Sequence, residues 1–141
     1  MKKLIMLFLF ILVGFGAFSQ YPQVYYNAVQ LMREKGYSVA DANSFYGNIK
    51  QGEIIYANKT FYSGFKYAIV AISEDGDVRD IDAYLYYLNG ELLIKDTNID
   101  DVAIIYLEPS YDITMQVQCK NYRSDTPNYA SRCWILIGFY Q

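Results

Sequence analysis

The sequence contains no histidine and only two cysteines among its 141 residues. Without histidine, Ser-His-Asp triads, Cys-His dyads and histidine-bearing zinc sites are excluded. No glycine-rich loop opens a predicted helix, so a phosphate-binding loop is not indicated. These absences remove the commonest routes to catalysis, and we expect that the protein is not an enzyme.

Basic residues are also few, with 12 Lys and Arg against 15 Asp and Glu. A chain with a formal net charge of −3 repels nucleic acid and anionic lipid, so we expect neither as a partner. The acidic residues gather between Glu74 and Asp101, where Arg79 and Lys95 are the basic residues. They indicate either a solvated rim of turns or a cation site.

Long apolar runs are absent after the first twenty residues. Residues 1–19 carry Lys2 and Lys3, then an apolar run from Leu4 to Val13, then small residues that end at Ser19. This order is typical of a secretory signal peptide, with cleavage after Ser19. The run is shorter than the roughly 20 residues of a membrane span, and we expect no transmembrane segment after cleavage. The sequence thus predicts a secreted or periplasmic protein.

Residues 20–52 are predicted to form a helical arm packed on the rest of the chain. Apolar residues at helical spacing, followed by Gly36, predict a helix from Gln23 to Lys35. A second short helix is expected over Val39–Gln51, where Val39, Ala42, Tyr46 and Ile49 would share one face.

Residues 53–141 show the period of β-strands and form the predicted second unit. Short apolar or alternating segments follow one another, separated by turns rich in Gly, Asp and Pro. We expect about seven strands, at 53–61, 66–73, 80–88, 91–95, 102–108, 111–120 and 133–140. The fold class is therefore mainly β: an antiparallel β-sandwich of jelly-roll or immunoglobulin-like layout, preceded by the helical arm.

The strand at 80–88 alternates clearly, and Asn89-Gly90 after it is a strong hairpin signal. Period two places Ile81, Ala83, Leu85 and Tyr87 on the core face. The other face, expected to point outward, carries Asp80, Asp82, Tyr84 and Tyr86.

Cys119 and Cys133 are predicted to form a disulfide. An even number of cysteines in an exported chain favours pairing. A hairpin about the loop at 121–131 would bring the two residues together, and closure of a loop of about 15 residues stabilises by roughly 3 kcal/mol.

Two strand motifs resemble those of the bacterial pre-peptidase C-terminal domain family, a group of small β-sandwiches. The first is Asp80-x-Asp82-x-Tyr84-Leu85, and the second is Tyr111-x-Ile113 with Val117 one step out of register. The resemblance covers residues 61–140, although Ala83 replaces the family's leucine and no peptidase domain precedes the module. It implies a non-catalytic module that binds calcium or an extracellular polymer.

Calcium is the cofactor that the acidic segment favours, because this ion takes six to eight hard oxygen ligands. Asp80, Asp82 and Asp96 are the candidate metal ligands, with flanking turns to supply further oxygens. The same three carboxylates could be offered for a glycoside hydrolase, which is the least favoured interpretation.

Tyr84 and Tyr86 are the candidate ligand-binding residues, because tyrosine presents an apolar ring and a hydroxyl to a glycan or protein. The alternative is that these tyrosines only cover and stabilise the sheet, since strands favour tyrosine. We therefore expect an exported binding module for an extracellular or cell-envelope glycan or protein. The alternative class is an envelope-associated structural protein or inhibitor that docks through the helical arm or an edge strand.

Overall fold

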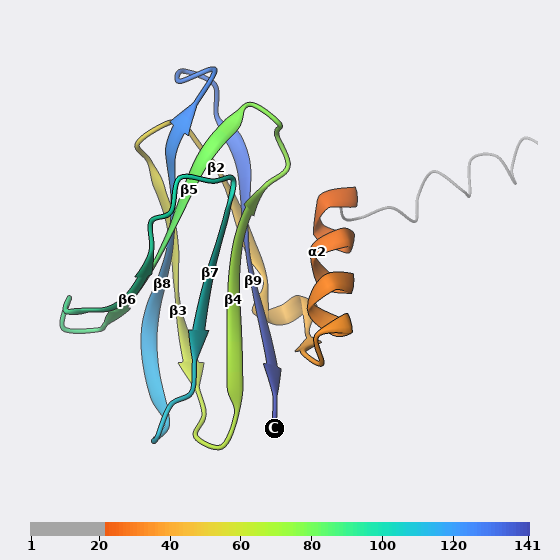
Figure 1. Ribbon diagram of the computed structural model, residues 1–141. Helices are drawn as coiled ribbons and strands as arrows, with labels where there is room; N and C mark the ends of the chain where they lie inside the picture. The colour runs from red at the N-terminus through yellow and green to blue at the C-terminus, as the bar shows by residue number, and fades with distance from the viewer. Residues whose placement is uncertain (1–21) are drawn as a thin grey trace, which may run out of the picture.

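The computed structural model describes residues 22–141, and the predicted signal peptide lies outside these residues (Figure 1). Two antiparallel sheets face each other, which confirms the predicted β-sandwich. Within the described range, no helix is long and apolar enough to cross a membrane. The elements are α2 (Gln23–Glu34), β1 (Ser38–Val39), the 3₁₀ turn η1 (Asp41–Asn43), β2 (Phe45–Ile49), β3 (Ile54–Phe61), β4 (Lys66–Ser73), β5 (Val78–Tyr87), β6 (Leu92–Asp96), β7 (Val102–Leu107), β8 (Ile113–Ser124) and β9 (Ser131–Tyr140).

One sheet, here called the helix-covered sheet, has the order β1-β9-β4-β7. The short strands β1 and β2 follow one another along the same edge of β9, opposite β4. The other sheet, here called the open sheet, has the order β3-β8-β5-β6. Helix α2 lies against the outer face of the helix-covered sheet, whereas no helix of the described chain covers the open sheet (Figure 1).

Two apolar clusters follow from this layering. The larger fills the space between the sheets, and the smaller joins α2 to the outer face of β4 and β9. In β4, Ile69 and Ala71 face the other sheet while Val70 and Ile72 face the helix. Both faces are thus buried, which is why this strand is a continuous apolar run.

Helix α2 confirms the predicted first helix. It ends in a Schellman motif, in which Tyr37 N–H donates to Met32 O and Gly36 N–H donates to Arg33 O. Gly36 has φ 91°, a conformation that favours glycine. The helix approaches β9 closely at Gly138, where an added Cβ would lie 2.6 Å from Met32 Cε.

The predicted second helix, Val39–Gln51, is wrong. That segment forms β1, η1 and β2, and β2 pairs residue by residue with β9 from Phe45↔Ile135 to Ile49↔Ser131. Its side chains alternate between half-buried and exposed, as a strand requires. The spacing of the apolar residues also fits a helix, but hydrogen bonding to a strand some 90 positions later decides the structure.

The predicted hairpin between the last two strands is also wrong, because β8 belongs to the open sheet and β9 to the helix-covered sheet. The predicted disulfide is not formed in the structure, where Cys119 and Cys133 are both free and buried. Both cysteines contribute to the cluster between the sheets. The pKa of the Cys119 thiol is raised by its interaction with Cys133 and by burial.

Candidate functional site

The outer face of the open sheet carries polar and aromatic side chains on three adjacent strands. We call this surface the tyrosine face and define it by Tyr56, Asn58, Tyr84, Tyr86, Gln116 and Gln118. On each strand these residues alternate with side chains that pack between the sheets, such as Ile55, Leu85 and Val117. The strand period therefore sends all six outward.

Strand register places these residues in two rows. Tyr56 pairs with Gln118, which pairs in turn with Tyr84. In the next row, Asn58 pairs with Gln116, which pairs with Tyr86. Directly paired side chains on one face of a sheet lie about 5 Å apart at Cβ, so each row is continuous across three strands.

Gln118 lies between Tyr56 and Tyr84, and Gln116 lies between Asn58 and Tyr86. Gln118 Nε2 donates to Gln116 Oε1 at 2.6 Å, so the two amides are held in a fixed relation. The Tyr84 and Tyr86 rings are stacked, with centroids 6.1 Å apart and planes inclined by 24°. Tyr56 on the opposite flank is 61% exposed. Apolar ring surface and amide groups thus reach solvent side by side.

A shallow depression of about 340 Å³ opens on this face beside the β5–β6 turn. It is lined by Asn58, Tyr86, Tyr87, Gln116 and Gln118 of the strands and by Leu88 and Gly90 of the turn. The turn is the predicted Asn-Gly hairpin, with Gly90 at φ 90° and Gly90 N–H donating to Tyr87 O. The hairpin therefore shapes one wall of the depression.

Tyr84 is anchored by a buried carboxylate. Its hydroxyl donates to Asp82 Oδ2 at 2.8 Å, and Asp82 is only 3% exposed. Burial, together with this hydrogen bond, raises the pKa of the Tyr84 phenol far above its ordinary value. Tyr84 therefore stays neutral, and its ring is fixed in place.

Asp80 and Asp82 were predicted to point outward to solvent, but both are buried. Asp80 Oδ1 is inaccessible and has no hydrogen-bond partner among the described residues. Burial raises the pKa of Asp80, the charges of Asp82 and Asp100 raise it further, and Arg123 opposes them. The alternation correctly placed these two side chains on the face away from the core, but it does not indicate which segments cover that face.

Asp96 lies apart from this pair. It pairs with Ala83, whose side chain packs between the sheets, so Asp96 projects from the opposite face to Asp82. Its carboxylate accepts hydrogen bonds from Ile104 N–H at 2.8 Å and Asn98 N–H at 3.2 Å. Asp96 thus accepts the Ile104 N–H on the outer edge of β7. This donor is then not available for pairing with another strand.

The turn carboxylates have similar structural partners. Asp75 Oδ2 accepts from Arg132 N–H, and the Asp77 carboxylate accepts from the hydroxyls of Ser124, Thr126 and Ser131. The hydroxyls of Thr126, Ser124 and Ser131 lower the pKa of Asp77. In residues 22–141 no group of three or more Cys, Asp or Glu side chains could hold a metal ion. The calcium site at Asp80, Asp82 and Asp96 stays a prediction, and the structure does not bring these three side chains together.

Comparison with known proteins gives only distant likenesses. No family model and no curated protein matches the chain, and membership of the pre-peptidase C-terminal family stays a prediction. Among solved structures, the chain is similar to AlgX from Pseudomonas aeruginosa, at 15% identity and a TM-score of 0.42 over 70% of this chain and 25% of that one.

Two further solved structures have lower TM-scores. They are the VP2 subviral particle of infectious bursal disease virus (17% identity, TM-score 0.33, 73% of this chain and 30% of that one) and the CBM22-1–GH10 modules of Clostridium thermocellum xylanase 10B with xylohexaose (8% identity, TM-score 0.33, 75% and 26%). The chain thus spans under a third of the length of each of these structures. Such distant likenesses transfer no function, so function is inferred below from the side chains of this protein.

Proposed function

We propose that this protein is an exported, non-catalytic binding module that takes an extracellular or cell-envelope glycan on the tyrosine face. The observation that carries the proposal is the pair of continuous rows, Tyr56-Gln118-Tyr84 and Asn58-Gln116-Tyr86, in which side-chain amides lie beside tyrosine rings. Sugar rings offer C–H faces that pack on an aromatic ring and hydroxyls that bond to amides. The tyrosine face offers both groups in one surface.

The rigidity of the surface supports this role. All six side chains arise from paired strands rather than loops, and Tyr84 is fixed by its bond to Asp82. A surface that is ordered before the ligand arrives loses less conformational entropy on binding. Since the exposed rings and amides carry no charge, a neutral glycan fits better than a charged polymer.

The alternative class docks through the helical arm or an edge strand, and docking through the arm required an exposed apolar stripe on α2. The stripe is instead buried: Tyr25, Val29 and Met32 are each no more than 5% exposed, against the helix-covered sheet. A carboxylate hydrolase is likewise not favoured, because Asp96 projects from the opposite face to Asp80 and Asp82. Binding without catalysis is therefore the interpretation that the side-chain positions favour.

The test is calorimetric titration and affinity electrophoresis with soluble neutral polysaccharides (xylan, hydroxyethyl cellulose, galactomannan), with alginate as the charged comparison. Tyr86→Ala should weaken binding of the preferred neutral glycan about tenfold or more, which corresponds to about 1.4 kcal/mol. Tyr56→Ala should also weaken binding of this glycan. Their melting temperatures should stay near that of the wild type, because both side chains reach solvent.

The matched control is Tyr129→Ala, which removes a 57% exposed tyrosine from the β8–β9 loop. It should leave binding unchanged. Equal loss in Tyr129→Ala and Tyr86→Ala, or no binding to any neutral glycan by the wild type, would rule out this use of the tyrosine face.

A further inference from the structure

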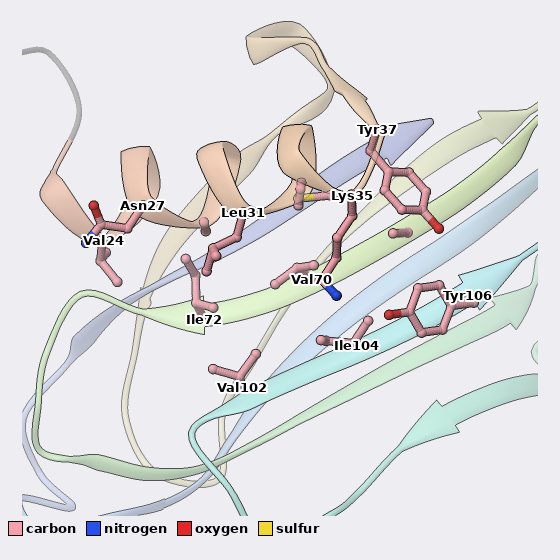
Figure 2. Close-up of a pocket in the computed structure, with 13 residues that line it drawn as sticks. Val24, Asn27, Leu31, Lys35, Tyr37, Val70, Ile72, Val102, Ile104 and Tyr106 are labelled. Carbon is pink, nitrogen blue, oxygen red and sulfur yellow. The ribbon is translucent and has the colours of Figure 1, made fainter. Parts of the chain in front are cut away.

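An apolar groove lies on the other side of the molecule, where α2 covers the helix-covered sheet incompletely (Figure 2). The helix lies over β9 and β4, and β7 at the edge of the sheet extends beyond it (Figure 1). The groove has a volume of about 290 Å³. It is separate from the tyrosine face, which lies on the outer face of the opposite sheet.

The walls of the groove are almost entirely aliphatic. Leu31 of the helix faces Val70 and Ile72 of β4, and Val102 and Ile104 of β7 complete the floor (Figure 2). Leu31 is 58% exposed and Ile104 is 39% exposed, although both lie beside buried apolar neighbours. Exposed aliphatic surface around a concave site is typical of a ligand pocket.

One end of the groove is polar. Lys35 extends from the end of the helix toward the sheet, and the Tyr37 and Tyr106 side chains lie at this same end of the groove (Figure 2). The ion pairs found in the described chain are Arg79–Asp125 and Arg132–Glu74, so Lys35 has no carboxylate partner there. Burial and the nearby Tyr140 and Tyr106 raise the pKa of Tyr37, which keeps its hydroxyl a neutral donor.

We infer that this groove binds a free, single-chain fatty acid, with the acyl chain between α2 and β7 and the carboxylate on Lys35. An ammonium group without a counter-ion above an aliphatic surface is complementary to a ligand with one anionic end and an apolar body. The tyrosine hydroxyls would add neutral hydrogen bonds to the same carboxylate.

The dimensions set the chain length. From Val24 to Lys35 the helix advances about 16 Å, at roughly 1.5 Å per residue. A groove of this length suits a medium-length acid such as dodecanoate.

The experiment is isothermal titration of the full mature protein with monomeric sodium octanoate, decanoate and dodecanoate. Each added methylene buried in the groove should tighten binding about fourfold. Dodecanol and dodecyltrimethylammonium, which share the chain but not the carboxylate, should bind at least tenfold more weakly than dodecanoate. These wild-type comparisons test the inference without any variant.

Two variants then locate the site. Lys35→Met keeps a long apolar side chain and should abolish the preference for dodecanoate over dodecanol. Ile104→Trp fills the groove from an edge strand and should abolish binding, whereas Ile99→Trp, at a 78% exposed position that does not line the groove, should not. Melting temperatures near the wild-type value show that each variant is folded. Neither groove variant should alter glycan binding, so failure here is distinguishable from failure of the proposed function.

Several outcomes would overturn the inference. They are no saturable binding of dodecanoate below its micellar concentration, equal affinity for the three head groups, or unchanged affinity in Ile104→Trp. Concentration-dependent dimerisation that Ile104→Trp abolishes would assign the groove to a second copy of the chain instead. Binding to anionic vesicles without binding of the free acid would assign it to a membrane surface.

Discussion

The two sheets of this sandwich meet their surroundings in opposite ways. The helix-covered sheet is buried on both faces at β4 and β9, so almost every side chain there serves packing. The open sheet is buried on one face, and its other face is free to carry Tyr56, Gln118 and Tyr86. This difference indicates that ligands are to be sought on the uncovered face of the open sheet and at the edge of the helix-covered sheet that α2 does not cover.

The largest expected effect is at the centre of the covered side. Leu136 is 0% exposed beneath α2, so Leu136→Ala should lower the free energy of unfolding by about 2–5 kcal/mol, through lost burial and a residual cavity. Asn58→Ala on the tyrosine face should change it by less than about 0.5 kcal/mol. Urea denaturation of both variants checks this, and similar losses would contradict the contrast between the two faces.

Alanine substitutions at two glycines test how tightly the two sheets pack on each other and how tightly the helix packs on its sheet. An added Cβ at Gly47 would lie 2.5 Å from Ile55 Cγ2, on a stiff β-branched side chain. Gly47→Ala should therefore cost about 1–3 kcal/mol from overpacking. At Gly138 the nearest atom is the flexible end of Met32, so Gly138→Ala should cost less. Thermal unfolding of the pair checks the order, and a greater loss in Gly138→Ala would show that the helix contact is the more rigid.

The anchored tyrosine of the open sheet gives a smaller effect. Tyr84→Phe removes the hydroxyl that donates to Asp82 and leaves a buried carboxylate oxygen without that partner. We expect a loss of about 1–2 kcal/mol in chemical denaturation, with the strands unchanged by circular dichroism. Tyr86→Phe is the matched control and should be near neutral. Equal stability of the two variants would show that the Asp82 bond does not hold Tyr84.

The smallest effect concerns pH. An acid whose pKa is higher in the folded than in the unfolded protein stabilises the fold at low pH, and that stabilisation is lost as the pH rises through the folded value. The pKa of Asp80 is raised in the fold, so Asp80→Asn should gain stability relative to the wild type between about pH 3 and pH 7. Melting temperatures across that range measure the gain, and exposed Asp101→Asn is the control. If the wild type instead became more stable relative to Asp80→Asn as the pH rises, the pKa of Asp80 would be lowered in the fold rather than raised.

Sequence periodicity predicted elements whose signals are local. The first helix has its glycine terminator at Gly36, the β5–β6 hairpin has Asn89-Gly90, and the apolar run of β4 is bounded by turns. The segment at 39–51 could not be predicted in this way, because its partner is β9. The pairing of β8 in one sheet and β9 in the other also depends on the assembled fold rather than on the loop between them.

The candidate site was predicted in part. Alternation in β5 placed Tyr84 and Tyr86 together on the face away from the core, and the structure agrees. Tyr56, Gln116 and Gln118 were missed, although they occupy the alternate positions of their own strands. The missing information was register, which aligns β3, β8 and β5 only once they pair. The burial of Asp80 was missed because strand parity does not reveal that the Asp100 backbone lies beside it.

The position of β9 in the helix-covered sheet has a consequence for biosynthesis. β1, β2 and β4 all hydrogen-bond to β9, which follows them at the C-terminal end of the described chain. These three strands therefore leave the ribosome long before their partner exists, and the sheet cannot close until β9 has been synthesised. Formation of this sheet must then wait for the synthesis of β9, and its distant pairings form slowly. Until then the apolar strand β4 remains exposed, which makes the nascent chain prone to aggregation.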